Sequence, residues 1–237
     1  MSGAASMLAV PRGGGGTIEA RVYSASPGSS RPPDRSTLIL APGAGAGQRH
    51  PFMTGVATAL AARGLDVVTF DFPYMTEGRR VPDRAAVLEQ VWRDVVGHLA
   101  GRGGSRLVVG GKSMGGRLAT HVMAAPDPPP AAGVVLLGYP LQPPRRPGVR
   151  RDAHLGAVAV PMLFVQGERD EFGGRDELAA LTSALGSRAT LHVVAGADHA
   201  FRVSRAVIAA QGDVLSAAWD VVAGWIDARV GRGGMFR

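Results

Sequence analysis

Short runs of apolar residues recur along the chain, separated by longer amphipathic stretches. Most of these runs lack the polar alternation of a half-exposed strand, and continuous apolar strands are typical of a parallel sheet that is buried on both faces. We predict strands, of which the first alternates, at 17–23, 37–40, 67–70, 106–109, 133–137, 162–165 and 191–194.

The stretches between these runs carry apolar residues at helical spacing, as Val87, Val91 and Val95 do on one face of the segment 82–100. Strands that alternate with helices predict an α/β fold with a mostly parallel central sheet and helices on both faces. The predicted helices are 51–63, 82–100, 114–125, 175–185 and a last segment from after Phe201 to about Val230, broken near Gly212.

The N-terminal segment is small, polar and rich in glycine, so we predict a flexible tail at 1–16. No linker or repeat divides the remainder, and 237 residues are the right size for one α/β domain, which we place at 17–237. The Pro- and Arg-rich connection at 139–160 is too short for a helical lid, so we expect an open site.

Composition narrows the class of protein. Apolar residues make up 46% of the chain and charged residues 19%, which fits a globular core. The absence of cysteine excludes disulfides, thiol nucleophiles and cysteine-ligated metals. No run approaches the ~20 apolar residues of a membrane span, and the N-terminus lacks the charged region of a secretory signal. We therefore expect a cytoplasmic protein with no membrane contact.

The net charge of +7 raises the question of a nucleic-acid partner. The basic residues are spread along the chain and are not interleaved with aromatic ones, so we expect no nucleic acid. They are nearly all arginine, which is typical of a GC-rich genome, and Lys112 is the one lysine. The positive balance could still favour an anionic substrate.

The strongest chemical signal is Gly111-Lys112-Ser113-Met114-Gly115, which matches G-x-S-x-G. It follows a predicted strand and opens a predicted helix, which is the context of a nucleophile elbow. The glycines leave room for a tight turn that lifts the serine above the sheet, and the helix N-terminus favours negative charge there. A glycine-rich turn with an idle serine is the structural alternative.

A serine nucleophile needs a base that is itself oriented by an acid. With a nucleophile elbow the chain order is serine, acid, histidine. Asp170 and His199 follow predicted strands, at the sheet edge where open α/β sheets place their sites. Glu168 and Glu171 compete with Asp170, which is favoured because a short turn can point its carboxylate back at His199. Asp198 is assigned to a turn or a supporting position.

The other histidines are less suited to act as the base. His192 lies within a predicted strand, and His98 and His121 lie on predicted helices. His154 could line the site, but it precedes the predicted acid in the chain.

Attack on a carbonyl builds negative charge, and each preorganised N–H donor stabilises it by roughly 3–4 kcal/mol. The predicted donors are the N–H of Met114 and that of Ala44, in the Gly-rich segment 42–47. That segment could instead cradle a phosphate, but it reads GxGxG and not GxGxxG. The Gly-Lys-Ser of the elbow lacks the earlier glycine of a Walker loop, because Arg106 stands there.

Several local strings resemble the alpha/beta-hydrolase superfamily, and more narrowly its dienelactone-hydrolase-like branch with the testis-expressed and NSL-complex-subunit hydrolase-like proteins. They are LAPGAGAG, HPFM, FDFPYM, GGKSMGGR, GYPL, QGERDEFG and GADHAF, between about 38 and 201. The resemblance implies an alpha/beta-hydrolase fold without a large lid, and a catalytic triad of Ser113, Asp170 and His199.

Two further points follow from the resemblance. Lys112 and Arg117, which flank the elbow, are typical of this branch. Pro42 departs from the pattern, because many relatives carry a histidine there whose side chain would brace the oxyanion loop.

Side chains that follow strand ends on the same edge are candidates for substrate contact, with core packing as the alternative for part of the set. They are His50, Phe52, Tyr74, Tyr139, Phe172 and Phe201. An anionic substrate group could meet His50 with Arg49, or the arginines between Arg145 and Arg151. Lys112 could pair with a carboxylate below the elbow or reach the pocket, and the first is favoured.

These observations predict a serine hydrolase that cleaves a carboxylic ester or thioester of a small to medium substrate through an acyl-enzyme. It would need no metal or cofactor and would act as a monomer or homodimer. Two alternatives stay open. One is a non-catalytic binding or scaffold protein, because a fold alone does not fix function. The other is an acyltransferase with a dry pocket.

Overall fold

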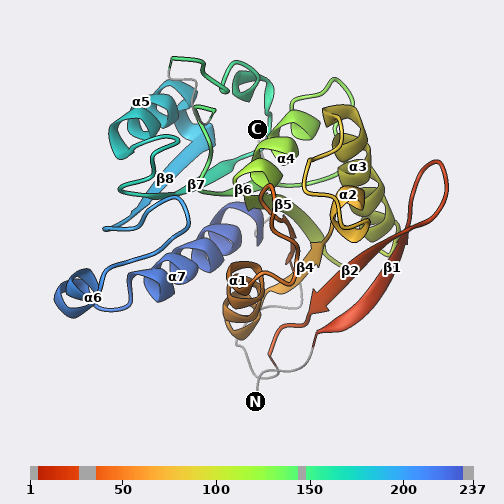
Figure 1. Ribbon diagram of the computed structural model, residues 1–237, viewed down its shortest axis with the longest axis horizontal. Coiled ribbons are helices and arrows are strands. Elements are labelled where there is room, and N and C mark those ends of the chain that lie inside the picture. The colour runs from red at the N-terminus through yellow and green to blue at the C-terminus, as the bar shows by residue number, and fades with distance from the viewer. Residues whose placement is uncertain (1–4, 27–35, 144–147, 232–237) are drawn as a thin grey trace.

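The computed structural model describes residues 5–26, 36–143 and 148–231. Within these residues, one eight-stranded sheet runs in the order β1-β2-β4-β3-β5-β6-β7-β8 (Figure 1). The strands from β3 onward are parallel, whereas β2 pairs antiparallel with both β1 and β4. Their bounds are β1 (Ser6–Pro11), β2 (Thr17–Tyr23), β3 (Ser36–Ala41), β4 (Asp66–Phe70), β5 (Arg106–Lys112), β6 (Val134–Leu137), β7 (Met162–Gly167) and β8 (Ala189–Val194).

Helices cover both faces of this sheet, which confirms the predicted alpha/beta-hydrolase architecture. Helices α1 and α7 pack on one face, and α3, α4 and α5 pack on the other. The helices are α1 (Pro51–Ala62), α2 (Pro73–Thr76), α3 (Ala85–Gly101), α4 (Met114–Met123), α5 (Arg175–Leu185), α6 (Arg205–Gln211) and α7 (Val214–Ile226).

Successive residues of the central strands supply the two faces in turn. In β3, Leu38 and Leu40 belong to the core under α1 and α7, whereas Ile39 and Ala41 belong to the core under α3 and α4. Every residue of β3 and β6 is buried. Double-sided burial therefore explains why the sequence shows continuous apolar runs and little alternation.

The predicted flexible tail at 1–16 is wrong for the residues of β1. This strand pairs with β2 in the register Val10 to Ile18, and Val10 is fully buried. The glycine-rich segment after it is a hairpin turn, closed by a hydrogen bond from the N–H of Gly15 to the carbonyl of Arg12. Gly14, Gly15 and Gly16 all have positive φ, which explains the local composition.

The C-terminal helical segment is broken where the sequence predicted. Helix α6 ends at Gln211, Gly212 has φ of +78°, and Asp213 caps α7 by accepting a hydrogen bond from the N–H of Ser216.

In the described ranges no single helix has the length and hydropathy to cross a bilayer. The bent pair Arg205–Gln211 and Val214–Val230 together has a sufficient length and composition.

The connection between β6 and β7 carries no lid helix in its described part. Its regular structure there is one short 3₁₀ turn, Leu155–Ala157. Within the described loop, the Tyr139 hydroxyl donates to the carbonyl of Arg151, and the Tyr139 side chain is buried in the core under α3 and α4. The predicted absence of a large lid is confirmed for these residues.

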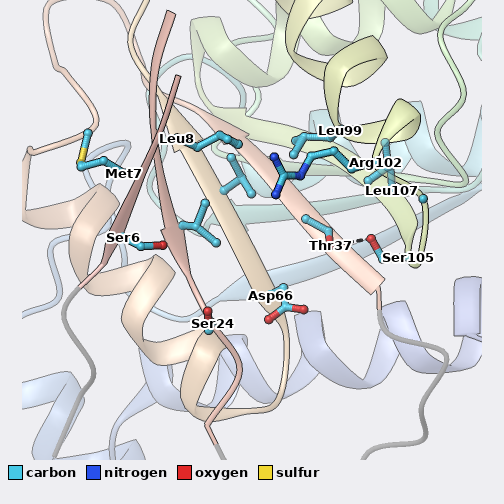
Figure 2. Close-up of a pocket in the computed structure, with 13 residues that line it drawn as sticks. Ser6, Met7, Leu8, Ser24, Thr37, Asp66, Leu99, Arg102, Ser105 and Leu107 are labelled. Atoms are coloured by element: carbon cyan, nitrogen blue, oxygen red, sulfur yellow. Dashed lines mark hydrogen bonds between the residues drawn. The ribbon is translucent and has the colours of Figure 1, made fainter. Parts of the chain in front are cut away.

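A cavity of about 360 Å³ lies at the amino ends of β3, β4 and β5, on the α3 face (Figure 2). Arg102, just after α3, extends its guanidinium over the sheet, and the hydroxyls of Thr37 and Ser105 share a hydrogen bond of 2.8 Å. Asp66 at its rim accepts a hydrogen bond from the N–H of Ala25. This cavity is at the end of the parallel strands opposite to the elbow.

Two histidines stack between α4 and the 3₁₀ turn. The rings of His121 and His154 lie 3.9 Å apart, the Arg117 guanidinium lies 3.0 Å from Nε2 of His121, and Thr120 Oγ1 lies 2.8 Å from Nε2 of His154. Burial, then the neighbouring His121 and Arg117, lowers the pKa of His154 to about 4. Burial and Arg117 also lower the pKa of His121. The surroundings of both rings therefore favour the neutral form.

The His154 site predicts a loss of stability in mild acid. Between about pH 6.5 and about pH 4, the unfolded chain binds a proton at His154 and the folded chain does not. The free energy of unfolding therefore decreases as the pH is lowered through this range. We expect His154→Gln to remove about 1–2 kcal/mol of this fall, after discounting for a half-buried group. Urea unfolding at pH 7.5 and 5.0 measures the difference. Equal pH dependence in both proteins would contradict the assignment.

Candidate active site

The turn between β5 and α4 holds Ser113 in a strained conformation. Its φ is +49° and its ψ is −112°, a region that non-glycine residues rarely occupy. The turn packs directly on the end of β3, because a Cβ atom at Gly111 or Gly115 would lie 2.4 Å from the carbonyl oxygen of Ala41. The two glycines are therefore required for this approach, as expected of a nucleophile elbow.

The structure brings the three predicted catalytic side chains into one hydrogen-bonded series. Oγ of Ser113 lies 3.0 Å from Nε2 of His199, and Nδ1 of His199 lies 2.8 Å from Oδ2 of Asp170. Asp170 is almost fully buried and its Oδ1 accepts the N–H of Phe172. An ionised Asp170 can only accept, so Nδ1 carries the hydrogen and Nε2 offers its lone pair to Ser113.

Gln166 orients the acid and was not identified from the sequence. It is fully buried at the end of β7, and its Nε2 donates to Oδ2 of Asp170 at 2.9 Å and to the carbonyl of Gly173 at 2.9 Å. Its Oε1 accepts the N–H of Tyr139 at 2.8 Å. The sequence signal for this role was the polar Gln166 near the end of an otherwise apolar strand.

Lys112 reaches the pocket, which was the less favoured of its two predicted placements. Its Nζ lies 3.3 Å from Nε2 of His199 and 5.4 Å from the centre of the Phe201 ring. Burial lowers the pKa of Lys112 to about 8, against the opposing effect of the nearby carboxylates of Asp170, Asp198 and Glu171.

Gln48, which follows the predicted oxyanion loop, binds it to the neighbouring strands through hydrogen bonds. The N–H of Gln48 donates to Oδ1 of Asp71, its Nε2 donates to the carbonyl of Glu19, and its Oε1 accepts from Thr69. Gln48 is fully buried, and burial raises the pKa of Asp71. This network supports the loop on β2 and β4, although Pro42 lacks the side chain that many relatives are expected to use.

A cavity of about 350 Å³ opens beside Ser113. Of the six side chains predicted to contact substrate, His50, Phe52 and Phe172 line it, and Phe172 also meets the His199 ring edge-on at 4.5 Å. Ala44, one predicted oxyanion donor, also lines the cavity, and Met114, the other, begins α4 next to Ser113. The remaining lining residues are Gly43, Ala46, Met53, Lys112, Ser113, His199 and Ala200.

The prediction of substrate contact is wrong for Tyr74, Tyr139 and Phe201. All three are buried, Tyr74 and Tyr139 in the core under α3 and α4, and Phe201 in the core under α1 and α7. The rings of Phe201, Phe52 and Trp219 form one cluster, in which Phe201 is tilted against the other two with ring centres at 5.2 and 6.3 Å. The position of a residue after a strand end determines at which edge of the sheet it lies. It does not determine whether the side chain turns into the core.

Of the predicted anion contacts that the structure describes, His50 lines this cavity and the arginines do not. Arg49 pairs with Glu19 on the surface, and Nδ1 of His50 accepts the N–H of Phe52 at the start of α1. Arg150 pairs with Asp152, and residues 144–147 of the arginine cluster lie outside the described part. Throughout the described ranges, no three or more His, Asp or Glu side chains are grouped to hold a metal ion.

A sequence profile of the family described as "Alpha/beta hydrolase domain" matches residues 34–227, which is most of the chain. The chain belongs to this alpha/beta hydrolase family.

Solved structures of similar fold cover nearly the whole alpha/beta hydrolase chain. One is described as a serine hydrolase without lid, from Xanthomonas campestris, with 19% identity, coverage of 98% of this chain and 96% of that one, and a TM-score of 0.69. Another is a dienelactone hydrolase from Anabaena variabilis, with 18% identity, 97% and 99% coverage, and a TM-score of 0.70. A third is an esterase domain from Rhodothermus marinus, with 16% identity, 94% and 98% coverage, and a TM-score of 0.68.

The buried Gln166 predicts a large loss of stability on its removal. Gln166→Leu leaves the Tyr139 N–H and the Asp170 carboxylate without their buried partner, so we expect the free energy of unfolding to fall by about 2–4 kcal/mol. Gln90→Leu, at an exposed site on α3, is the matched control and should change it by about 0.5 kcal/mol or less. Urea denaturation followed by circular dichroism measures both, and equal losses would contradict the role of Gln166.

Proposed function

We propose that the protein is a serine hydrolase that cleaves small to medium carboxylic esters or thioesters through an acyl-enzyme. The observation that carries this is the hydrogen-bonded series from Ser113 through His199 to Asp170, which ends at the wall of a cavity. The fold, the family and the esterase and hydrolase neighbours support a hydrolase in general. The narrower dienelactone-hydrolase-like and testis-expressed branch, the cytoplasmic location and the monomer or homodimer state remain predictions.

The geometry suits a two-step acyl transfer. Oγ of Ser113 attacks the carbonyl carbon while Nε2 of His199 takes its proton, and Asp170 stabilises the imidazolium that forms. The carbonyl oxygen becomes negative and is stabilised by the N–H groups of Ala44 and Met114. The alcohol or thiol leaves with the proton from His199. Water, deprotonated by His199, then releases the acid and restores Ser113.

The cavity supports a substrate of limited size. Its walls are mainly apolar, from Phe52, Met53 and Phe172, and its volume of about 350 Å³ is at the low end of small-molecule pockets. Because the described part of the β6–β7 connection has no lid helix, water can reach the acyl-enzyme. This favours hydrolysis over acyl transfer to another acceptor. A non-catalytic binding role has no physical need for the ordered series of serine, histidine and carboxylate.

Labelling by a fluorophosphonate tests the activated serine directly. We expect wild type to be phosphonylated, Ser113→Ala to be unlabelled, and His199→Gln to react at least about 10³-fold more slowly, because the base is lost. Ser183→Ala, at an exposed position on α5, is the control and should label like wild type. A folded wild type that is not labelled would overturn the hydrolase proposal and favour a binding protein.

Acyl-chain length tests the size of the cavity. With p-nitrophenyl esters we expect kcat/KM to be higher for butanoate than for dodecanoate, because the longer chain exceeds the apolar wall. Phe52→Ala enlarges the cavity at that wall. The ratio of kcat/KM for the longer ester to that for the shorter one should rise about tenfold, since each buried methylene contributes about 0.8 kcal/mol. An unchanged chain-length profile in the variant would show that the acyl chain lies elsewhere.

A further inference from the structure

We propose that Lys112 is a positioning residue that acts through His199: as an ammonium it competes with Ser113 for Nε2, and its deprotonation releases the histidine for catalysis. The proposal rests on the hydrolase function above. It adds a proton-dependent control at a residue outside the serine, histidine and aspartate series.

The competition follows from the geometry at one atom. Nε2 of His199 has two neighbours, Oγ of Ser113 at 3.0 Å and Nζ of Lys112 at 3.3 Å. Because Nδ1 carries the hydrogen that binds Asp170, Nε2 has a single lone pair in the plane of the ring. A hydrogen donated by the ammonium therefore occupies the position that must accept the proton of Ser113.

The charge of Lys112 acts in the same direction. When His199 takes the serine proton it becomes a cation, and a second cation 3.3 Å from Nε2 repels it. Lys112 Nζ lies next to the ring of Phe201 and the backbone of Gly138. Because the group is buried there, this repulsion is stronger than it would be in water. A neutral Lys112 removes both the competing ammonium and the repulsion.

Several groups determine when Lys112 becomes neutral. The carboxylates of Asp170, Glu171 and Asp198 favour its charged form, and His199 is the titratable ring in contact with it. Burial outweighs the carboxylates and lowers the pKa of Lys112 to about 8. Within the range of ordinary buffers the group therefore changes from mainly charged to mainly neutral.

The residue type fits this role. The chain has 26 lysines and arginines, and Lys112 is the one lysine among them. A guanidinium stays protonated in proteins, whereas a buried lysine can lose its proton. A position that must change its charge near neutral pH can use lysine but not arginine.

The first test is the rate of phosphonylation by a neutral fluorophosphonate between pH 7 and 9. In wild type we expect a rise of about tenfold, which is the change in the neutral fraction of a group with a midpoint near 8. Lys112→Met, similar in length and without charge, should be flat over this range and about tenfold faster than wild type at pH 7. Arg49→Met removes an exposed positive charge that does not line the cavity and should keep the wild-type rise.

The second test measures the proton on Lys112 without any reaction. Lysine labelled with ¹³C at Cε gives a single side-chain signal in this protein, because there is one lysine. We expect its chemical shift to titrate with a midpoint near 8 that coincides with the rise in phosphonylation. Asp170→Asn removes a carboxylate that favours the ammonium and should lower the midpoint.

Each possible failure has a distinct meaning. A lysine midpoint above 10, an equal rise with pH in Lys112→Met, or a folded Lys112→Met that is slower than wild type at pH 7 would each overturn the role of Lys112. Wild type that is unlabelled at every pH would overturn the hydrolase function itself, and this proposal with it.

Discussion

The contact between the elbow and the end of β3 is the constraint on which the site depends. Glycines at 111 and 115 let the chain pass so close to the carbonyl of Ala41 that a methyl group could not be inserted at either position. The same contact brings the segment after β3, with Ala44, beside Ser113. Ser113, the proposed nucleophile, and its predicted oxyanion donor are therefore positioned by backbone packing, which is rigid, and the strain at Ser113 is held by the sheet beneath it.

Buried amides complete this arrangement where the backbone cannot. Gln166 joins the Asp170 carboxylate to the backbone of the β6–β7 connection, and Gln48 joins the oxyanion loop to β2 and β4. An amide both donates and accepts, so one side chain can satisfy several buried groups without adding charge. Beside the cavity, Asp170, His199 and Lys112 form one hydrogen-bonded cluster, in which a change of charge at one member changes the energy of the others.

The two ends of the sheet differ in what they present. At the carboxyl ends of the parallel strands the loops converge on the cavity with Ser113, whereas the amino ends carry a separate cavity around Arg102. Topology explains the difference, because parallel strands deliver the loops that follow them to one edge. Chemistry-bearing residues after β3, β5, β7 and β8 meet there although they are distant in sequence.

The sequence by itself determined the sheet, because strands buried on both faces must be continuously apolar, and the elbow, because only glycines permit that turn. It also indicated Ser113, Asp170 and His199, since the chain order and the strand ends restrict the choice. It did not determine β1, whose short apolar segment is stabilised by pairing with β2. Nor could it decide which strand-end aromatics turn inward, as Tyr74, Tyr139 and Phe201 do, or that Lys112 meets His199. Those outcomes depend on side-chain directions and on contacts between distant segments, which exist only once the chain has packed.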